Sequence, residues 1–165
     1  MKKTDIKFKK ISKRGFTLIE TIIYAALISV IIGITVVAVY QIIQFSDSLN
    51  KKNIVEEEAN FILRKIGWAL AGTPSINSPV SGTTSTVISI NKINYSANPI
   101  IFDLDSQNLR IKKGGSEPVV LNSQNVAVSN VVFEHIAAIG NKPDAIKTNF
   151  QINEKSYQLL IYLPR

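Results

Sequence analysis

The chain has 165 residues, a length that allows one modest globular domain with an appendage. Its formal net charge of +7 is concentrated in residues 1–15, which hold seven lysines and arginines against one aspartate, whereas the remaining residues hold 12 basic and 11 acidic side chains. Such a near-neutral body argues against nucleic-acid binding, which needs a basic face. The absence of cysteine excludes disulfides and thiolate metal sites, and one histidine, His135, gives little support for a histidine-based metal or catalytic site.

The basic residues 1–15 are followed by a long apolar segment. Glu20 is the only acid or base within residues 16–45, and Thr21–Tyr40 is a run of 20 uncharged residues. About 20 apolar residues cross the hydrocarbon core of a membrane as a helix. A cleaved secretory signal would have a shorter apolar core followed by a small-residue cleavage site. Here the apolar run is longer, and no such site follows it. We therefore expect a transmembrane helix over 16–45, with the positive N-terminus on the cytoplasmic side.

The helical pattern continues over residues 46–72, but with a mixed composition. Apolar residues recur there at spacings of four, three, four and four, which is typical of one buried stripe on a helix: Val55, Ala59, Ile62, Ile66 and Leu70. No proline interrupts residues 16–72, and Gly72-Thr73-Pro74 predicts the helix end.

Three features of this second half have their own interpretations. Phe61 and Trp68 are expected to be core anchors. The acidic run Glu56–Glu58 predicts a solvated helix face, with docking to basic residues of a neighbouring subunit as the alternative.

Residues 73–165 predict a β-rich body. Small residues, proline and glycine over 73–85 indicate a loop. After it, period-two patterns predict strands at Val87–Tyr95 (broken in phase at 91–92), Ile100–Leu104, Leu109–Lys112, Pro118–Leu121, Val126–His135, Ile146–Ile152 and Tyr157–Leu163. The turn residues Asp105–Asn108 predict a hairpin. The expected fold class is α+β, with the long helix packed on an antiparallel sheet.

The run Gly15-Phe16-Thr17-Leu18-Ile19-Glu20 is similar to the prepilin signal of type IV pilins and of the pseudopilins of type II secretion. The resemblance also covers the basic leader that ends at Gly15 and the uncharged span after Glu20. It implies that a prepilin peptidase cuts between Gly15 and Phe16 on the cytoplasmic side, removes residues 1–15 and leaves Phe16 to be N-methylated. Glycine suits such a cut because no Cβ obstructs the extended backbone in a protease cleft.

Glu20 is the unusual residue of this segment. A carboxylate within an apolar span costs on the order of 3 kcal/mol, so it usually has a partner or a function. Its place one helical turn from the cleaved terminus suggests a cationic amine as the partner, from its own chain or a neighbour. In the resembling family this acid is linked to subunit assembly and methylation. The alternative is that Glu20 lies at the interface and reaches the lipid headgroups.

Unlike many major pilins, the span lacks a central proline and the chain lacks cysteine. The closer resemblance is to minor pilins of the PilW type and to J-type minor pseudopilins, through the helix end near Trp68–Gly72, the hairpin within Phe102–Arg110 and the run Val128–Phe133. It implies a structural subunit of a type IV pilus or a type II secretion pseudopilus, anchored once in the inner membrane with the C-terminal domain outside. The implied partners are the prepilin peptidase, other pilin or pseudopilin subunits, membrane lipid and, indirectly, an inner-membrane platform protein and an assembly ATPase. A tip adhesin, a DNA-uptake (competence) pilin and an unprocessed single-pass protein remain alternatives.

Other candidate sites are weak. Asp103 and Asp105 resemble part of a calcium loop, but no glutamate follows at the EF-hand spacing, and a polar hairpin turn accounts for them equally well. Glu134 and His135 are expected on a solvated strand end. No nucleophile–base pair or phosphate loop emerges, so we expect no enzyme, no cofactor and no metal.

Overall fold

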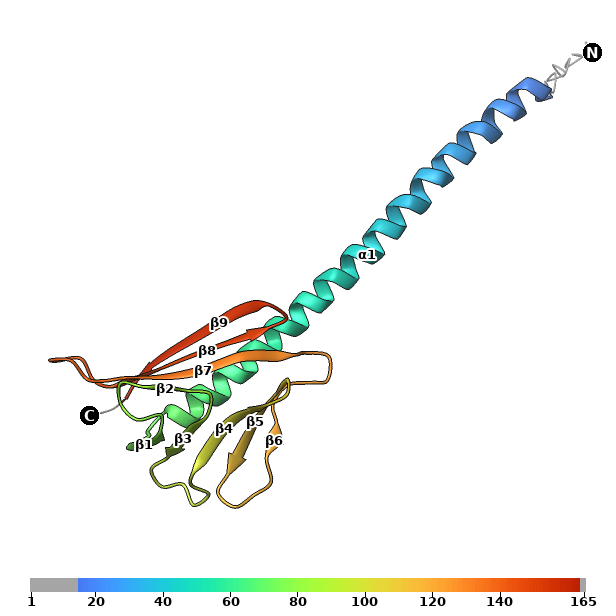
Figure 1. Cartoon of the computed structure of the whole chain (residues 1–165). Coiled ribbons are helices and arrows are strands. Elements are labelled where there is room, and N and C mark those ends of the chain that lie inside the picture. Colours follow the sequence, from blue (N-terminus) through green and yellow to red (C-terminus); the bar gives the residue numbers. More distant parts are fainter. Residues whose placement is uncertain (1–14, 164–165) are drawn as a thin grey trace, which may run out of the picture. The chain divides into compact units, whose positions relative to one another are not determined.

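The computed structural model describes residues 15–163, so the predicted basic leader lies outside the described residues except for Gly15. Within these described residues, one long helix, α1 (Leu18–Leu70), is followed by nine strands (Figure 1). The chain divides into two compact units, Met1–Ser48 and Leu49–Arg165, which are described separately.

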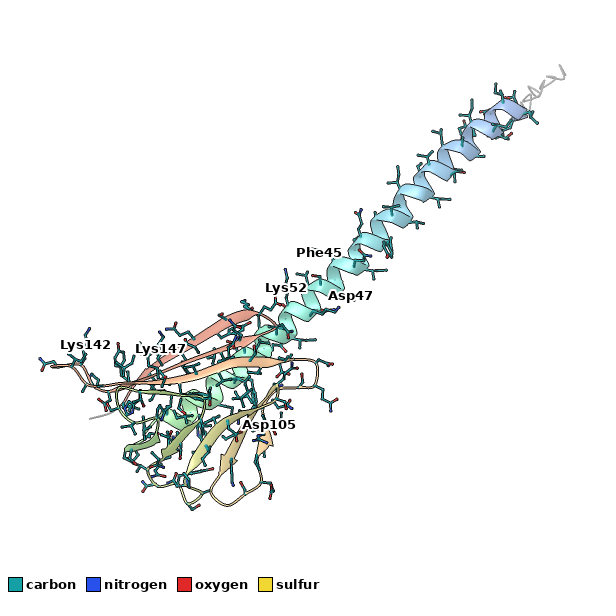
Figure 2. All side chains as sticks on the ribbon, in the orientation of Figure 1. Phe45, Asp47, Lys52, Asp105, Lys142 and Lys147 are labelled. Atoms are coloured by element: carbon teal, nitrogen blue, oxygen red, sulfur yellow. The ribbon has the colours of Figure 1, made fainter. Side chains whose placement is uncertain are left out.

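In the first unit, α1 is apolar and uncovered. From Thr21 to Ser48 every side chain is exposed, and Figure 2 shows them projecting around the ribbon up to Phe45. Ser29 and Thr35 donate their hydroxyls to carbonyl oxygens one turn earlier, which satisfies these polar groups without water. The helix is long and apolar enough to cross a membrane.

The second unit holds two antiparallel sheets. Their strands are β1 (Ser75–Ser78), β2 (Thr84–Ser85), β3 (Ile88–Asn91), β4 (Ile100–Asp105), β5 (Asn108–Lys113), β6 (Val119–Val120), β7 (Val128–Ile136), β8 (Ala145–Ile152) and β9 (Lys155–Tyr162). One sheet has the order β1-β3-β4-β5-β6, and the other has the order β2-β7-β8-β9. Buried residues alternate along β4, β5, β7 and β8, as expected for sheets with one face in a core.

The last turns of α1 share a single core with both sheets. The predicted apolar stripe is confirmed, because Ala59, Ile62, Ile66 and Leu70 are buried and Val55 packs against them. Their neighbours in this core include Phe102 of one sheet and the aromatic residues of the other, Phe133 and Phe150. The α+β fold with a long N-terminal helix is therefore confirmed.

The predicted loop over 73–85 was wrong in part. It contains β1, which pairs with β3, and β2, which pairs with β7. These strands are made of serine, threonine and asparagine around a single isoleucine, so backbone pairing forms them without the hydrophobic alternation that a sequence pattern detects.

Phe61 and Trp68 are not core anchors. They are 37% and 40% exposed, and the buried positions around them belong to the stripe one residue later, at Ile62 and Ala69. A side chain one residue away on a helix is rotated by about 100°, which is enough to move it out of the core.

The predicted hairpin is confirmed. Strands β4 and β5 pair from Ile100–Lys113 to Asp105–Asn108, and Ser106 and Gln107 form the turn. The phase break at 91–92 is also real: β3 ends at Asn91, and the chain turns before β4.

Candidate processing and assembly site

Gly15, Phe16 and Thr17 form the exposed, non-helical approach to α1. A Cβ built on Gly15 would meet no heavy atom within 4 Å, so the space on that side of the backbone is open. Phe16 is 72% exposed. The peptide bond between Gly15 and Phe16 therefore lies outside the helix and is exposed.

Thr17 caps the helix. Its Oγ1 accepts a hydrogen bond from the Glu20 amide at 3.4 Å, and its carbonyl oxygen accepts from the amides of Glu20 and Thr21. Thr17 and Glu20 are thus the N-cap and N3 residues of a Thr-x-x-Glu pattern, in which the cap satisfies a free amide of the first turn. A carboxylate in this turn is also stabilised by the helix dipole.

Glu20 has a neighbour that the sequence analysis missed. Tyr24, one turn later, donates its hydroxyl to Glu20 Oε1 at 3.2 Å. The Tyr24 ring also meets the Phe16 ring edge-on, with centroids 6.1 Å apart. Within residues 15–163 no cation forms an ion pair with Glu20, so its hydrogen-bond partner in this turn is neutral. Phe16, Glu20 and Tyr24 therefore form one contiguous set at the start of α1.

Residues 10–36 match the model of the prokaryotic N-terminal methylation motif, a range that includes Gly15, Phe16 and Glu20. The chain carries a prepilin-type methylation motif. No curated protein and no solved structure matches the chain significantly.

The prepilin motif supports the type IV pilin and pseudopilin family, and with it a prepilin-type substrate. It implies processing by a peptidase and assembly with other pilins. Together with the apolar helix, it is consistent with a single-pass protein anchored in a membrane. A motif of this kind indicates a structural subunit.

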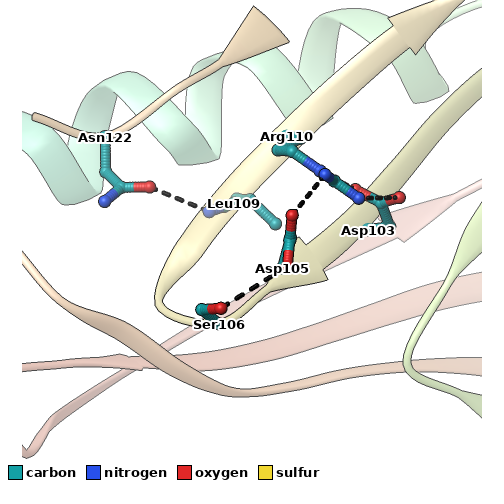
Figure 3. Close-up of polar contacts among 6 residues, drawn as sticks. All are labelled: Asp103, Asp105, Ser106, Leu109, Arg110 and Asn122. Carbon is teal, nitrogen blue, oxygen red and sulfur yellow. Dashed lines mark hydrogen bonds and ion pairs between the residues drawn. The ribbon is translucent and has the colours of Figure 1, made fainter. Parts of the chain in front are cut away.

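The carboxylates of Asp103 and Asp105 both bind the side chain of an arginine (Figure 3). Arg110 lies opposite Asp103 in the β4–β5 register and binds both of its carboxylate oxygens, with Nε and Nη2 each at 2.9 Å. Its Nη1 reaches Asp105 Oδ2 at 2.5 Å. Hydrogen bonding to Asp103 raises the pKa of Arg110 above its ordinary value. The guanidinium thus engages both carboxylates within the hairpin and offsets one of their two negative charges, so a calcium ion would have to compete with it.

The expectation of a solvated His135 was wrong, because this side chain is buried at 7% exposure. Its Nδ1 lies 3.0 Å from the Pro79 carbonyl oxygen, and its Nε2 lies 3.3 Å from Asp144 Oδ2. Asp144 also accepts the Ala138 amide at 2.5 Å. His135 therefore ties β7 to the segments on either side of it. Among the described residues no group of three or more potential ligands could hold a metal ion.

The sequence spacing alone indicates the roles of two further residues of the site, Thr17 and Tyr24. Thr17 and Glu20 have the spacing of a capping box, Thr-x-x-Glu, directly before an apolar run. Tyr24 lies at the i, i+4 spacing that brings two helical side chains together.

Proposed function

We propose that this protein is a minor pilin or pseudopilin, a structural subunit that a prepilin peptidase cuts between Gly15 and Phe16 and that then enters a pilus or pseudopilus. The main support for the proposal is the methylation motif over residues 10–36, which covers the start of an apolar, uncovered helix. The open backbone at Gly15 supports the position of the cut. The proposed segments are the removed leader 1–15, the membrane helix 16–45, its amphipathic continuation 46–72 and the β-rich domain 73–165.

Glu20 is the proposed assembly residue. After the cut, the new amine of Phe16 would stand one turn from the Glu20 carboxylate, and an amine of a neighbouring subunit would provide the same charge. A buried carboxylate in an apolar span is stabilised by such a partner. The Tyr24 hydroxyl holds the carboxylate in place but does not neutralise it.

The proposed subtype is supported by two features of major pilins that this chain lacks. Residues 16–72 contain no proline, and the chain contains no cysteine. Both absences favour a minor subunit.

Intact-mass measurement of the full chain from peptidase-competent cells tests the cut. The expected chain begins at Phe16 and carries one additional methyl group, whereas Gly15→Ala leaves the leader attached. Gly33→Ala is the matched control, because a methyl group at Gly33 also meets nothing within 4 Å. A wild-type chain that retains Met1 would contradict the proposal.

Two variants separate the charge of Glu20 from its hydrogen bond. Glu20→Gln keeps the size and the Tyr24 contact but removes the charge, so it should abolish incorporation into sheared filaments while leaving cleavage intact. Tyr24→Phe keeps the charge and removes the contact, so incorporation should persist. Normal incorporation of Glu20→Gln would show that the assembly role is wrong.

A further inference from the structure

Glu20 is more covered than the residues around it. Among residues 15–54 it is the one residue that is not exposed, whereas Ile19 beside it is 68% exposed. Within an apolar span a carboxylate is the kind of group that is most costly to place against lipid. The start of α1 therefore covers the side chain for which cover matters most.

Tyr24 contacts both Glu20 and Phe16. Long side chains on a helix point toward its N-terminus, over the preceding turn, so the Tyr24 hydroxyl reaches the residue four positions earlier. It donates a hydrogen bond to Glu20 Oε1 at 3.2 Å. The same ring meets the Phe16 ring edge-on, at an interplanar angle of 73°. One side chain thus holds the carboxylate and packs on the residue that would become the new terminus.

The structure shows this turn before any cut, because Gly15 is still joined to Phe16. The Phe16 nitrogen is therefore an amide, which carries no charge and cannot neutralise a carboxylate. Within residues 15–163 no cation pairs with Glu20, and its second oxygen, Oε2, accepts no hydrogen bond from them. In the uncut chain the carboxylate thus has a neutral donor on one oxygen and an open position on the other.

The other hydroxyl groups of this segment do not replace Tyr24. Three of them donate to carbonyl oxygens of the helix backbone instead, those of Thr21, Ser29 and Thr35. Tyr40 has Val36 at the position where Tyr24 has Glu20, so it faces no acceptor side chain there. Within residues 15–163, Tyr24 is the side chain that donates to the Glu20 carboxylate.

We propose that Tyr24 is the partner of Glu20 in the membrane while the leader is attached, and that cleavage exchanges this partner for the new Phe16 amine. This exchange rests on the proposed function, since it needs the cut between Gly15 and Phe16. Tyr24 is a positioning residue: it takes no part in the cut, and it covers the acid until a charged partner exists.

The exchange is favourable because the second partner is charged. An ammonium group adds a full opposite charge to the hydrogen bond, and the low dielectric of an apolar span strengthens that attraction. Before the cut this amine does not exist, so a neutral hydroxyl is the partner that the turn provides. Glu20 therefore becomes available for an ion pair with the Phe16 amine only after cleavage.

Carbodiimide labelling of the full, uncut chain in membranes tests the cover. A hydrophobic carbodiimide reacts with carboxyl groups inside the bilayer, and intact-mass measurement gives the rate. In cells that lack the peptidase, Tyr24→Phe should raise the labelling rate of Glu20 about threefold to tenfold, because the carboxylate loses its hydrogen bond within an apolar span. Glu20→Gln should abolish this labelling, which identifies the labelled residue.

Tyr40→Phe is the matched control, since it makes the same change in the same span at an exposed tyrosine. It should leave the rate at the wild-type value. Tyr24→Leu removes the hydroxyl and also the ring contact with Phe16, so its rate should be at least that of Tyr24→Phe. Equal rates for the wild-type chain and Tyr24→Phe, or an equal increase with Tyr40→Phe, overturn the role of Tyr24.

A comparison of uncut and cut chains tests the exchange. In the cut chain Tyr24→Phe should leave the labelling rate of Glu20 unchanged, because the amine has replaced the hydroxyl. Solid-state NMR with isotope-labelled glutamate carboxyl carbon and phenylalanine nitrogen should detect the Glu20 carbon close to an amine nitrogen in the cut chain. The uncut Gly15→Ala chain should instead show the Glu20 carbon close to the Tyr24 ring. A Tyr24 contact that persists after the cut, with no amine close to Glu20, overturns the exchange.

The two proposals fail in different ways. A wild-type chain that keeps its leader in peptidase-competent cells contradicts the proposed function and the exchange together. A chain that is cut normally, but in which Tyr24→Phe has the same effect before and after the cut, contradicts the exchange alone.

Discussion

The ammonium group of Lys155 donates a hydrogen bond to the carboxylate of Glu56, from the first residue of β9 to a turn of α1 that lies 99 residues earlier in the sequence. Tyr157 donates its hydroxyl to the same Glu56 oxygen at 3.3 Å. This contact fastens an edge strand to the helix at the point where α1 enters the β-rich unit.

The contact predicts that the stability of the fold decreases at both low and high pH. Hydrogen bonding to Lys155 lowers the pKa of Glu56 below its ordinary value of 4.5, and bonding to Glu56 raises the pKa of Lys155 above 10.5. The lowered Glu56 pKa contributes stability that is lost as the pH falls through it. The raised Lys155 pKa contributes stability that is lost as the pH rises through it. Thermal unfolding of the detergent-solubilised chain should show both losses.

Lys155→Met should remove the loss of stability at high pH and weaken the loss at low pH, where the Tyr157 hydroxyl still lowers the Glu56 pKa. Lys142→Met is the control, because Lys142 is exposed and forms no ion pair within residues 15–163. High salt should weaken the wild-type effect, since both partners face solvent. Equal pH profiles for wild type and Lys155→Met would contradict the prediction.

Thr17→Ala should loosen the start of α1. The loss of an N-cap costs about 1 kcal/mol, which corresponds to roughly fivefold faster amide exchange in the first turn. Hydrogen exchange of the segment that contains Glu20 and Thr21 measures it. Thr35→Ala is the control, since the Thr35 hydroxyl bonds a carbonyl in mid-helix and caps nothing. Thr17→Ser should behave as wild type.

Calcium should leave the melting temperature unchanged. Arg110 already binds both carboxylates of the β4–β5 hairpin, so a cation would have to displace it. Asp103→Asn should destabilise the fold more than Asp105→Asn, because Asp103 binds the guanidinium through two oxygens and Asp105 through one. A calcium-dependent rise in melting temperature that Asp103→Asn abolishes would contradict this account.

His135→Phe should lower the free energy of unfolding by about 1–3 kcal/mol, since it leaves the buried Pro79 carbonyl oxygen without a donor. The adjacent Glu134→Gln should change stability by less than about 1 kcal/mol, because its pair with Lys147 is long, at 3.8 Å, and half exposed. Chemical denaturation of both variants provides the comparison. Equal effects would indicate that His135 is not held as the distances imply.

Glu154→Gly should stabilise the β8–β9 hairpin by about 1 kcal/mol. Asn153 and Glu154 form its two-residue turn with φ angles of 46° and 72°, a conformation that glycine adopts without strain and glutamate does not. Asn153→Gly should gain less, because asparagine tolerates this conformation and its side chain faces the Ala127 amide at 3.5 Å. Melting temperatures of the two variants give the ranking.

Much of the fold could be predicted because its signals are local. The uncharged run after Glu20, the apolar stripe from Val55 to Leu70 and the β4–β5 hairpin each depend on neighbours within a few residues. The strands β1 and β2 could not be predicted, because their partners β3 and β7 are distant and their own residues are polar.

The candidate site was predicted less completely. Gly15, Phe16 and Glu20 came from the motif, and their roles in cleavage, methylation and assembly remain predictions. Thr17 and Tyr24 were missed, although each lies at a spacing that brings it to Glu20 on a helix.

By itself, the sequence determined the membrane-length helix, the methylation motif and the α+β class, since each follows from periodicity or composition along a short stretch. Only the tertiary structure decided that His135 is buried, that Arg110 binds both Asp103 and Asp105, and that Phe61 and Trp68 face outward. The physical reason is that burial and pairing depend on which distant surface covers a side chain. For the start of α1, where the described chain itself covers almost nothing, local sequence was sufficient.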